Sequence, residues 1–341
     1  MKRTELISVE HLYEGMVLGE DILGPFELLV LSRGKKLSEQ NVSVIKKQGL
    51  DFIYIEVSSK EEKELKEKYL ELESELKEIF TSSGQISRAV KDRIQATLNE
   101  MLHTLPQKVN ILMELKRLKE KDTYSVKHSI QVGLLSGLMG IWLQLPEGII
   151  QELALAGTMH DIGKTLIPQE LLNKPGKLTN SEFEKIQKHT LYGYKKLSQV
   201  GDIPNSVCRV ALEHHERLDG SGYPAKHTED NIHFFSKLVT IADIFDASTT
   251  NKVYGSRIQP LHALHELEKF RDARKIDPTL FDAFVRNVYK LFVGCSVVLD
   301  NGMEGEIAFF HKLSPNRPII RVNDKLMNLA HHPEVGIKDI F

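Results

Sequence analysis

The sequence has few cysteines and a single tryptophan. Its 341 residues contain only Cys208 and Cys295, which lie far apart and form no CxxC pattern. This spacing excludes a disulfide framework and a zinc site built from thiolates, and it is typical of a reducing compartment. We therefore expect a cytoplasmic protein in which both cysteines are small buried side chains.

Net charge and long apolar runs are also scarce. The formal net charge is -2, with 27% charged residues, so the composition excludes a general attraction to nucleic-acid polymers or acidic surfaces. The amino terminus has no apolar core of the signal-peptide type. One stretch of 18 residues without formal charge, Ser129 to Pro146, contains three glycines and four Ser or Gln residues. We interpret it as a core helix in which Gly133 and Gly137 permit close packing, and we expect no membrane span.

The order of sequence patterns predicts a mainly α-helical protein with a small unit at each end. Residues 1–57 read as a mixed α/β accessory domain, with a strand pair in "EDILG" and "FELLVLSRG", a helix that Ser38 begins and Gly49 ends, and a strand in "DFIYIEV". Residues 58–121 read as a helical linker, and residues 122–290 as a helical domain. In residues 291–341, two apolar runs flank an Asp-Asn-Gly turn and "RPIIRV" supplies a third strand, which indicates a β-rich unit.

The linker contains a short heptad-like pattern. Apolar residues recur at alternating spacings of four and three at Leu65, Tyr69, Leu72, Leu76 and Ile79. Two heptads are too few to require a coiled coil. The pattern leaves two alternatives open, a linker helix that is packed or solvated and a helix that forms a homodimer seam.

Seven histidine and aspartate side chains are distributed through the helical domain in groups about 30 residues apart. This spacing allows a helix and a loop between groups, so one group per helical hairpin could converge on a single point. Imidazole and carboxylate without thiolate suit iron or manganese, with zinc, nickel, magnesium or cobalt as alternatives. Because the set is larger than one ion needs, we predict two divalent ions with Asp161 as the bridge. The candidate ligands are His128, His160, Asp161, His189, His214, His215 and Asp243.

Four motifs resemble the signatures of HD-GYP phosphodiesterases, a branch of the HD superfamily. They are "HDIGK" from His160, "KPGKLTNSEFEKIQKH" from Lys174, "HHERLDGSGYP" from His214 and "DIFDA" from Asp243. The resemblance covers about 170 residues. It implies an α-helical HD-GYP catalytic core that opens cyclic di-GMP to linear pGpG or on to GMP, by attack of a hydroxide that bridges two metals.

The resemblance also assigns roles to individual residues. It implies that Asp161 belongs to both metal sites, and that Asp161 and Lys164 are catalytic. One ion would be held by His128, His160, Asp161 and Asp243, and the other by Asp161, His189, His214 and His215. Lys164, four residues after His160, would lie on the same face of a continuing helix and reach a phosphate oxygen. The predicted substrate-binding residues are Lys164, Gly222, Tyr223, Pro224 and Lys252.

The sequence departs from the family pattern at several positions. Tyr124 stands where some members have a glutamate that supports a third ion, so we predict two metals. Lys252 and Gly255 occupy positions that are basic in many members and face the substrate phosphates, and Arg257 is a candidate to compensate. Two alternatives therefore stay open. The protein could hydrolyse another cyclic dinucleotide or nucleotide, or it could be a weakly active or inactive nucleotide-sensing module.

Overall fold

The computed structural model describes residues 3–9, 12–24, 28–48, 50, 52–57, 59–81, 86–105, 124–249, 260–311, 314–323 and 325–340. Within these ranges the chain forms two compact units. One contains the described residues up to 66 and from 288 onward, and the other contains those from 67 to 104 and from 124 to 287. A helical core is preceded by a small mixed α/β segment and followed by a β-rich segment, which confirms the predicted fold class.

The amino-terminal segments form small sheets and one helix around their own apolar core. The three-stranded sheet has the order β1-β5-β2 with antiparallel pairing, and β3 pairs with β4 as the predicted hairpin. Ser38 caps α1 by accepting a hydrogen bond from the backbone N–H of Asn41, as its position in the sequence predicts. The elements are β1 (Arg3–Ser8), β2 (Val17–Leu18), β3 (Ile22–Leu23), β4 (Leu29–Leu31), α1 (Glu39–Lys46) and β5 (Phe52–Val57).

The carboxy-terminal segments form a five-stranded antiparallel sheet of order β10-β6-β7-β8-β9. The predicted Asp-Asn-Gly turn joins β6 to β7, and "RPIIRV" lies in β8. The sequence patterns did not predict β1, β2, β9 or β10, which are short strands without an extended apolar run. The bounds are β6 (Ser296–Leu299), β7 (Glu304–His311), β8 (Ser314–Val322), β9 (Lys325–Asn328) and β10 (Ile337–Ile340).

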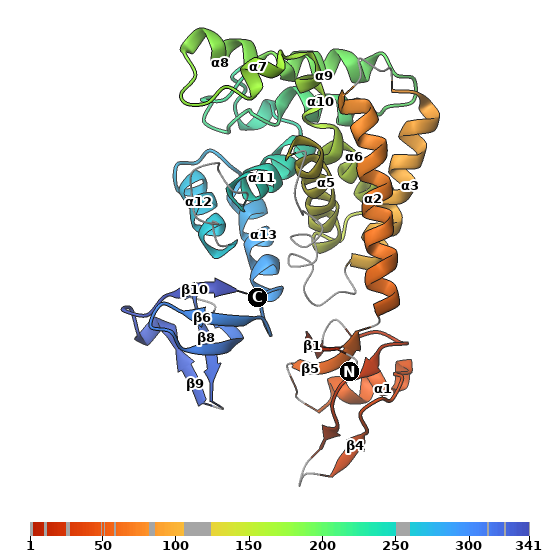
Figure 1. The fold of residues 1–341 in the computed structure, drawn as a ribbon, viewed down its shortest axis with the longest axis vertical. Coiled ribbons are helices and arrows are strands. Elements are labelled where there is room, and N and C mark those ends of the chain that lie inside the picture. The colour runs from red at the N-terminus through yellow and green to blue at the C-terminus, as the bar shows by residue number, and fades with distance from the viewer. Residues whose placement is uncertain are drawn as a thin grey trace. The chain divides into compact units, whose positions relative to one another are not determined.

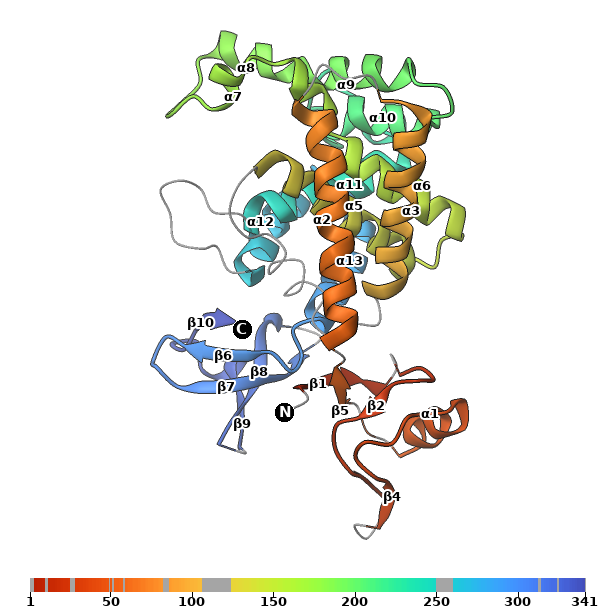
Figure 2. The same ribbon diagram turned by 45° about the vertical axis from the view of Figure 1, so that its right-hand side comes forward.

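Helices dominate the described part of residues 59–290. Figures 1 and 2 show α7 to α10 gathered at one end of the helical unit, next to the bundle that contains α5, α6 and α11. The longer helices are α2 (Ser59–Thr81), α3 (Arg88–Thr104), α5 (Tyr124–Trp142), α6 (Glu147–Met159), α11 (Phe234–Thr249), α12 (Pro260–Asp272) and α13 (Pro278–Lys290). The shorter ones are η4 (Ile162–Leu166), α7 (Gln169–Leu172), α8 (Asn180–Gln187), α9 (His189–Ser198) and α10 (Asn205–Glu213).

Helix α5 is the centre of the helical unit, and it is buried from Val126 to Gly140. At Gly133 an added Cβ would lie 1.9 Å from the Thr158 hydroxyl oxygen on α6, so only glycine permits this approach. The apolar stretch that begins at Ser129 is therefore a core helix, and its glycines serve close packing. Among the helices that the structure describes, none combines the length and apolarity needed to cross a bilayer.

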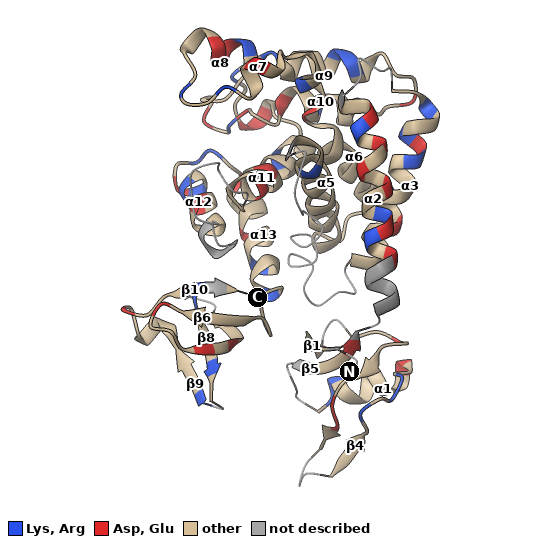
Figure 3. Ribbon diagram, in the orientation of Figure 1, with Lys and Arg blue, Asp and Glu red and all other residues tan. Residues whose placement is uncertain are grey.

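Helix α2 buries one stripe and exposes a charged surface. Tyr69, Leu72, Leu76 and Ile79 are all buried within the single chain. Figure 3 shows acidic and basic residues interspersed along α2 and α3. Packing within one chain thus accounts for the heptad-like pattern, and the dimer seam stays a prediction.

Candidate metal centre

One group of candidate ligands joins three helical segments. His128 comes from the first half of α5, His160 follows the last residue of α6, and Asp243 comes from the middle of α11. One ligand atom from each lies within 4.8 Å of the others. The closest pair is His128 Nε2 and Asp243 Oδ1, at 3.1 Å. These distances leave room for a cation at the centre of the group.

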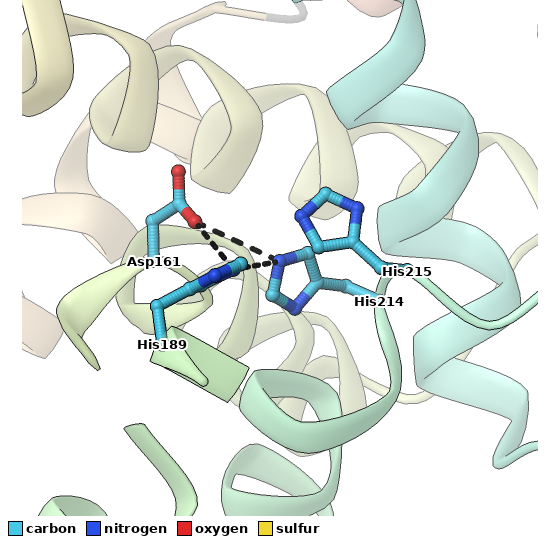
Figure 4. Close-up of side chains that lie close together, drawn as sticks. All are labelled: Asp161, His189, His214 and His215. Carbon is cyan, nitrogen blue, oxygen red and sulfur yellow. Dashed lines mark hydrogen bonds and ion pairs between the residues drawn. The ribbon is translucent and has the colours of Figure 1, made fainter. Parts of the chain in front are cut away.

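A second group lies beside the first. His189 begins α9, while His214 and His215 follow the end of α10, where successive side chains can turn toward one centre. Together with Asp161 they place one ligand atom each within 4.8 Å of the others. Figure 4 shows the three rings and the Asp161 carboxylate converging. The structure thus brings all seven predicted ligands together in two groups.

Asp161 lies between the two groups and directs one oxygen at each. Its Oδ1 is 3.4 Å from His189 Nε2 and 3.6 Å from His214 Nε2. Its Oδ2 is 3.3 Å from His160 Nε2 and 3.8 Å from His128 Nε2. This is the arrangement that a carboxylate needs to bridge two cations.

Hydrogen bonds on the far side of the rings orient four of the histidines. The Nδ1 atoms of His160, His189 and His214 lie 2.6 to 3.0 Å from backbone carbonyl oxygens three or four residues earlier in the chain. His128 Nδ1 lies 2.8 Å from Asp246 Oδ2. Because a carbonyl or carboxylate oxygen only accepts, each Nδ1 carries the proton and donates it. Each Nε2 is then the nitrogen left to face the centre, as in metal-binding imidazoles.

Burial keeps the histidines of the second group in their neutral form. It lowers the pKa of His189 to about 4 and lowers the pKa of His214 and His215, so these rings are neutral at pH 7. Burial also raises the pKa of Asp161, but the charges of Lys164 and His160 outweigh it, and the net pKa is well below the usual value. Neutral imidazoles around an ionised carboxylate are the forms that bind metal.

Two buried polar atoms of the centre have no hydrogen-bond partner among the described residues. They are His160 Nε2 and Asp161 Oδ1. Burying such atoms without a partner is costly, and a cation would satisfy both. At His128, burial lowers the pKa, but the hydrogen bonds to Asp243 and Asp246 outweigh it and raise the pKa to about 9, so a proton and a cation compete for Nε2. The residues therefore fit divalent cations.

Comparison with known proteins identifies the family. The family model for the HD domain matches residues 93–280, more than half of the chain. The chain belongs to the HD domain family. This confirms, for the family, the resemblance based on the four motifs.

Curated relatives of this HD domain chain are named as cyclic-dinucleotide phosphodiesterases. The cyclic di-GMP phosphodiesterase PA4108 of Pseudomonas aeruginosa is 35% identical over 213 residues, which are 62% of this chain and 51% of that protein. The 3'3'-cGAMP-specific phosphodiesterase 1 of Vibrio cholerae is 35% identical over 167 residues, which are 49% of this chain and 38% of that protein. The chain spans about half the length of the curated relatives it matches or less.

A solved structure shares the fold. Bd1817, an HDG"Y"P protein from Bdellovibrio bacteriovorus, aligns with a TM-score of 0.55 and 16% identity over 84% of this chain and 99% of its own. At this identity the likeness shows the fold alone.

In the HD domain, Lys164 contacts the centre from a different helix than the one predicted. The spacing of four residues predicts that Lys164 lies on a helix continuing from His160, but α6 ends at Met159 and Lys164 lies in the separate short helix η4. Its Nζ contacts Asp161 Oδ2 at 2.5 Å, so its partner is the aspartate three residues earlier. Gly163 in η4 packs so tightly on the His189 carbonyl oxygen that an added Cβ would lie 1.9 Å from it, so this approach requires glycine.

The predicted Gly-Tyr-Pro loop packs beside the second histidine group. A Cβ on Gly222 would lie 2.5 Å from the His215 carbonyl oxygen, and the Tyr223 ring centroid is 4.7 Å from that of His215. The buried Glu216 carboxylate accepts hydrogen bonds from the backbone N–H groups of Ala225 and His227, at 2.7 and 3.0 Å. The loop is thus fixed against a candidate ligand.

The sequence patterns did not reveal several functional candidates. Asp246 and Glu216 lie in quoted motifs, and the spacing of Asp246 three residues after Asp243 was the signal that could have revealed its role. A cavity bounded by His215, Gly222, Tyr223 and Pro224 was not foreseen, because segments far apart in the sequence form it. The predictions for Lys252, Gly255 and Arg257 lie outside the described residues.

Proposed function

We propose that this HD domain protein hydrolyses the phosphodiester bonds of cyclic di-GMP, to linear pGpG or on to GMP, with two divalent metal ions as cofactors. The observation that carries the proposal is the Asp161 carboxylate, whose two oxygens face separate groups of histidines. The relatives named as cyclic di-GMP phosphodiesterases support the choice of substrate.

Each group of side chains would hold one ion, with Asp161 shared. Bound there, the cations would activate water as a nucleophile at neutral pH and offset the charge that develops on the phosphate. Iron or manganese fits the ligand set best because imidazole and carboxylate dominate it. The groups are His128, His160 and Asp243 for one ion, and His189, His214 and His215 for the other.

The other residues of the centre position the substrate. Lys164 contacts Asp161 and remains about one third exposed, so its ammonium can also meet a phosphate oxygen as a point charge. The loop of Gly222, Tyr223 and Pro224 lines the adjoining cavity, where it can contact the nucleotide. Lys252, predicted to face a phosphate, belongs to the proposal on the sequence alone.

The test is hydrolysis by protein purified without oxygen and loaded with iron or manganese. Cyclic di-GMP is incubated with the loaded protein and the products are separated by chromatography. We expect pGpG or GMP from the wild type, none from Asp161→Ala, and unchanged turnover by Asp230→Ala, which removes an exposed aspartate in η5 (Glu229–Asn231). Equal turnover by the Asp161 variant would refute the proposal, and cyclic di-GMP binding without products would favour a sensing module.

A second candidate substrate is cyclic GMP-AMP. Three relatives from Vibrio cholerae are named as 3'3'-cGAMP-specific phosphodiesterases. Parallel incubation with this dinucleotide ranks the two substrates by kcat/KM.

A further inference from the structure

A cavity of about 680 Å³ adjoins the second histidine group. Helix α8, the start of α9, the loop after α10 and the end of α12 form it, all within the helical unit. His215 belongs both to the candidate metal centre and to the wall of this cavity. A ligand whose phosphate lies at the centre therefore has this space beside it for the rest of the molecule.

The cavity wall combines exposed apolar rings with positive charge. Phe183 of α8 is 46% exposed, and its ring meets that of Tyr223 edge to face at a centroid distance of 6.0 Å. Arg217 and Lys275 also line the cavity, and the Arg217 guanidinium lies over the Phe270 ring. A flat apolar surface next to cations is what a nucleotide needs, since its base stacks and its phosphate is anionic.

Glu184 adds selectivity to this surface. It follows Phe183, lines the cavity and is exposed, and no described residue forms an ion pair or hydrogen bond with its carboxylate. Guanine carries adjacent N1–H and 2-amino donors, which match the two oxygens of a carboxylate. Adenine presents a lone pair at N1 and has no 2-amino group, so it would leave the carboxylate unpaired.

We propose that this cavity is the base-binding subsite, with Phe183 as the stacking platform and Glu184 as the residue that selects guanine. The inference deepens the proposed function and rests on it in taking the substrate to be a nucleotide. It assigns specificity to α8, which contributes no candidate metal ligand.

Calorimetric titration of the manganese-loaded protein with GMP and with AMP tests the subsite without requiring turnover. We expect GMP to bind more tightly than AMP. Phe183→Ala should lower the affinity for both nucleotides by about tenfold or more, because it removes a stacking surface. Glu184→Gln should lower the affinity for GMP by about tenfold and leave the affinity for AMP within about twofold of the wild-type value.

Two matched variants serve as controls. Phe234→Ala removes a phenylalanine that is 42% exposed outside the cavity wall, and Glu170→Gln changes an exposed glutamate on α7. Both should bind GMP like the wild type. Equal affinity for GMP and AMP, or equal effects of the Phe183 and Phe234 variants, would overturn the proposal.

Hydrolysis of bis(4-nitrophenyl) phosphate, which has no base, separates this inference from the proposed function. We expect Phe183→Ala to retain that hydrolysis and to lose kcat/KM for cyclic di-GMP. Selective GMP binding by a protein that hydrolyses neither compound would keep the subsite and refute the proposed function. Hydrolysis of both compounds by a protein that does not bind GMP more tightly than AMP would support the proposed function and refute the base-binding subsite.

Discussion

Four of the candidate ligands are oriented by a hydrogen bond on the side of the ring that faces away from the centre: His128, His160, His189 and His214. For His160, His189 and His214 the acceptor is a backbone carbonyl three or four residues earlier in the chain, so no substitution of a side chain removes it. His128 differs because its acceptor is the Asp246 carboxylate, 118 residues away in the sequence. Asp246 is therefore the position where ring orientation can be tested directly.

Asp246→Ala should weaken metal binding without removing a ligand. The His128 ring would lose the acceptor that fixes its tautomer, and outer partners of this kind typically contribute about 10- to 100-fold in metal affinity. Manganese titration of the variant measures the loss. Asp246→Asn, which keeps an acceptor oxygen, should retain more affinity than Asp246→Ala, and equal affinities in the wild type and both variants would contradict this role.

Gly222→Ala should disturb the loop and His215 together. The new Cβ would lie 2.5 Å from backbone atoms of His215, Glu216 and Arg217, and relieving such a contact typically costs about 1–3 kcal/mol. Urea denaturation measures the free energy of unfolding. Gly148→Ala is the control, because a Cβ there meets nothing within 4 Å, and it should leave stability near the wild-type value.

A capping box fixes the start of α8, the helix that carries Phe183 and Glu184. Thr179 accepts a hydrogen bond from the N–H of Glu182, and the Glu182 carboxylate accepts one from the N–H of Thr179. Lys174 contacts both oxygens of this carboxylate at 2.7 Å. The cap thus ties the cavity wall to the preceding loop.

The Glu182 carboxylate should stay ionised in acid. Hydrogen bonds from Lys174 and from the Thr179 backbone lower its pKa from 4.5 to about 2. A lowered pKa means that the carboxylate contributes stability above pH 4.5, and that this contribution is lost as the pH falls from 4.5 through 2. NMR titration of the side-chain carboxyl carbon measures the pKa. A midpoint near 4.5 would show that the cap does not form in solution.

The sequence predicted long helices well and local breaks poorly. The apolar periodicity of α2 and the cap of α1 were readable because they depend on neighbouring residues. The break between α6 and η4 was not readable from neighbouring residues, and beside it Gly163 contacts the His189 carbonyl of another helix. Strands β9 and β10 were missed for the same reason, since pairing partners define them more than their own residues.

The candidate ligands come from segments spread between residues 128 and 243. The motifs showed which residue types to collect, and the structure brings them together. The sequence could not show the cavity, since its walls come from α8, the loop after α10 and the end of α12. A pattern along one helix contains no information about which distant segment lies opposite.

Metal should stabilise the helical unit as a whole. Cations that bind only the folded state add about 2.7 kcal/mol when their concentration is 100 times the dissociation constant. We expect manganese to raise the melting temperature of chelator-treated protein and elemental analysis to find about two ions per chain. Asp161→Ala should remove most of the increase, whereas Asp230→Ala should keep it. A firm stoichiometry of one or three would contradict the assignment of ligands.

The position of Asp161 has a thermodynamic consequence. Because one carboxylate faces both groups, occupancy of one half changes the charge and orientation that the other half encounters. The two affinities are then linked, and by reciprocity each ion alters the affinity for its neighbour by the same factor. The occupancy of either half therefore depends on whether the other half is filled, and two independent dissociation constants do not describe the pair.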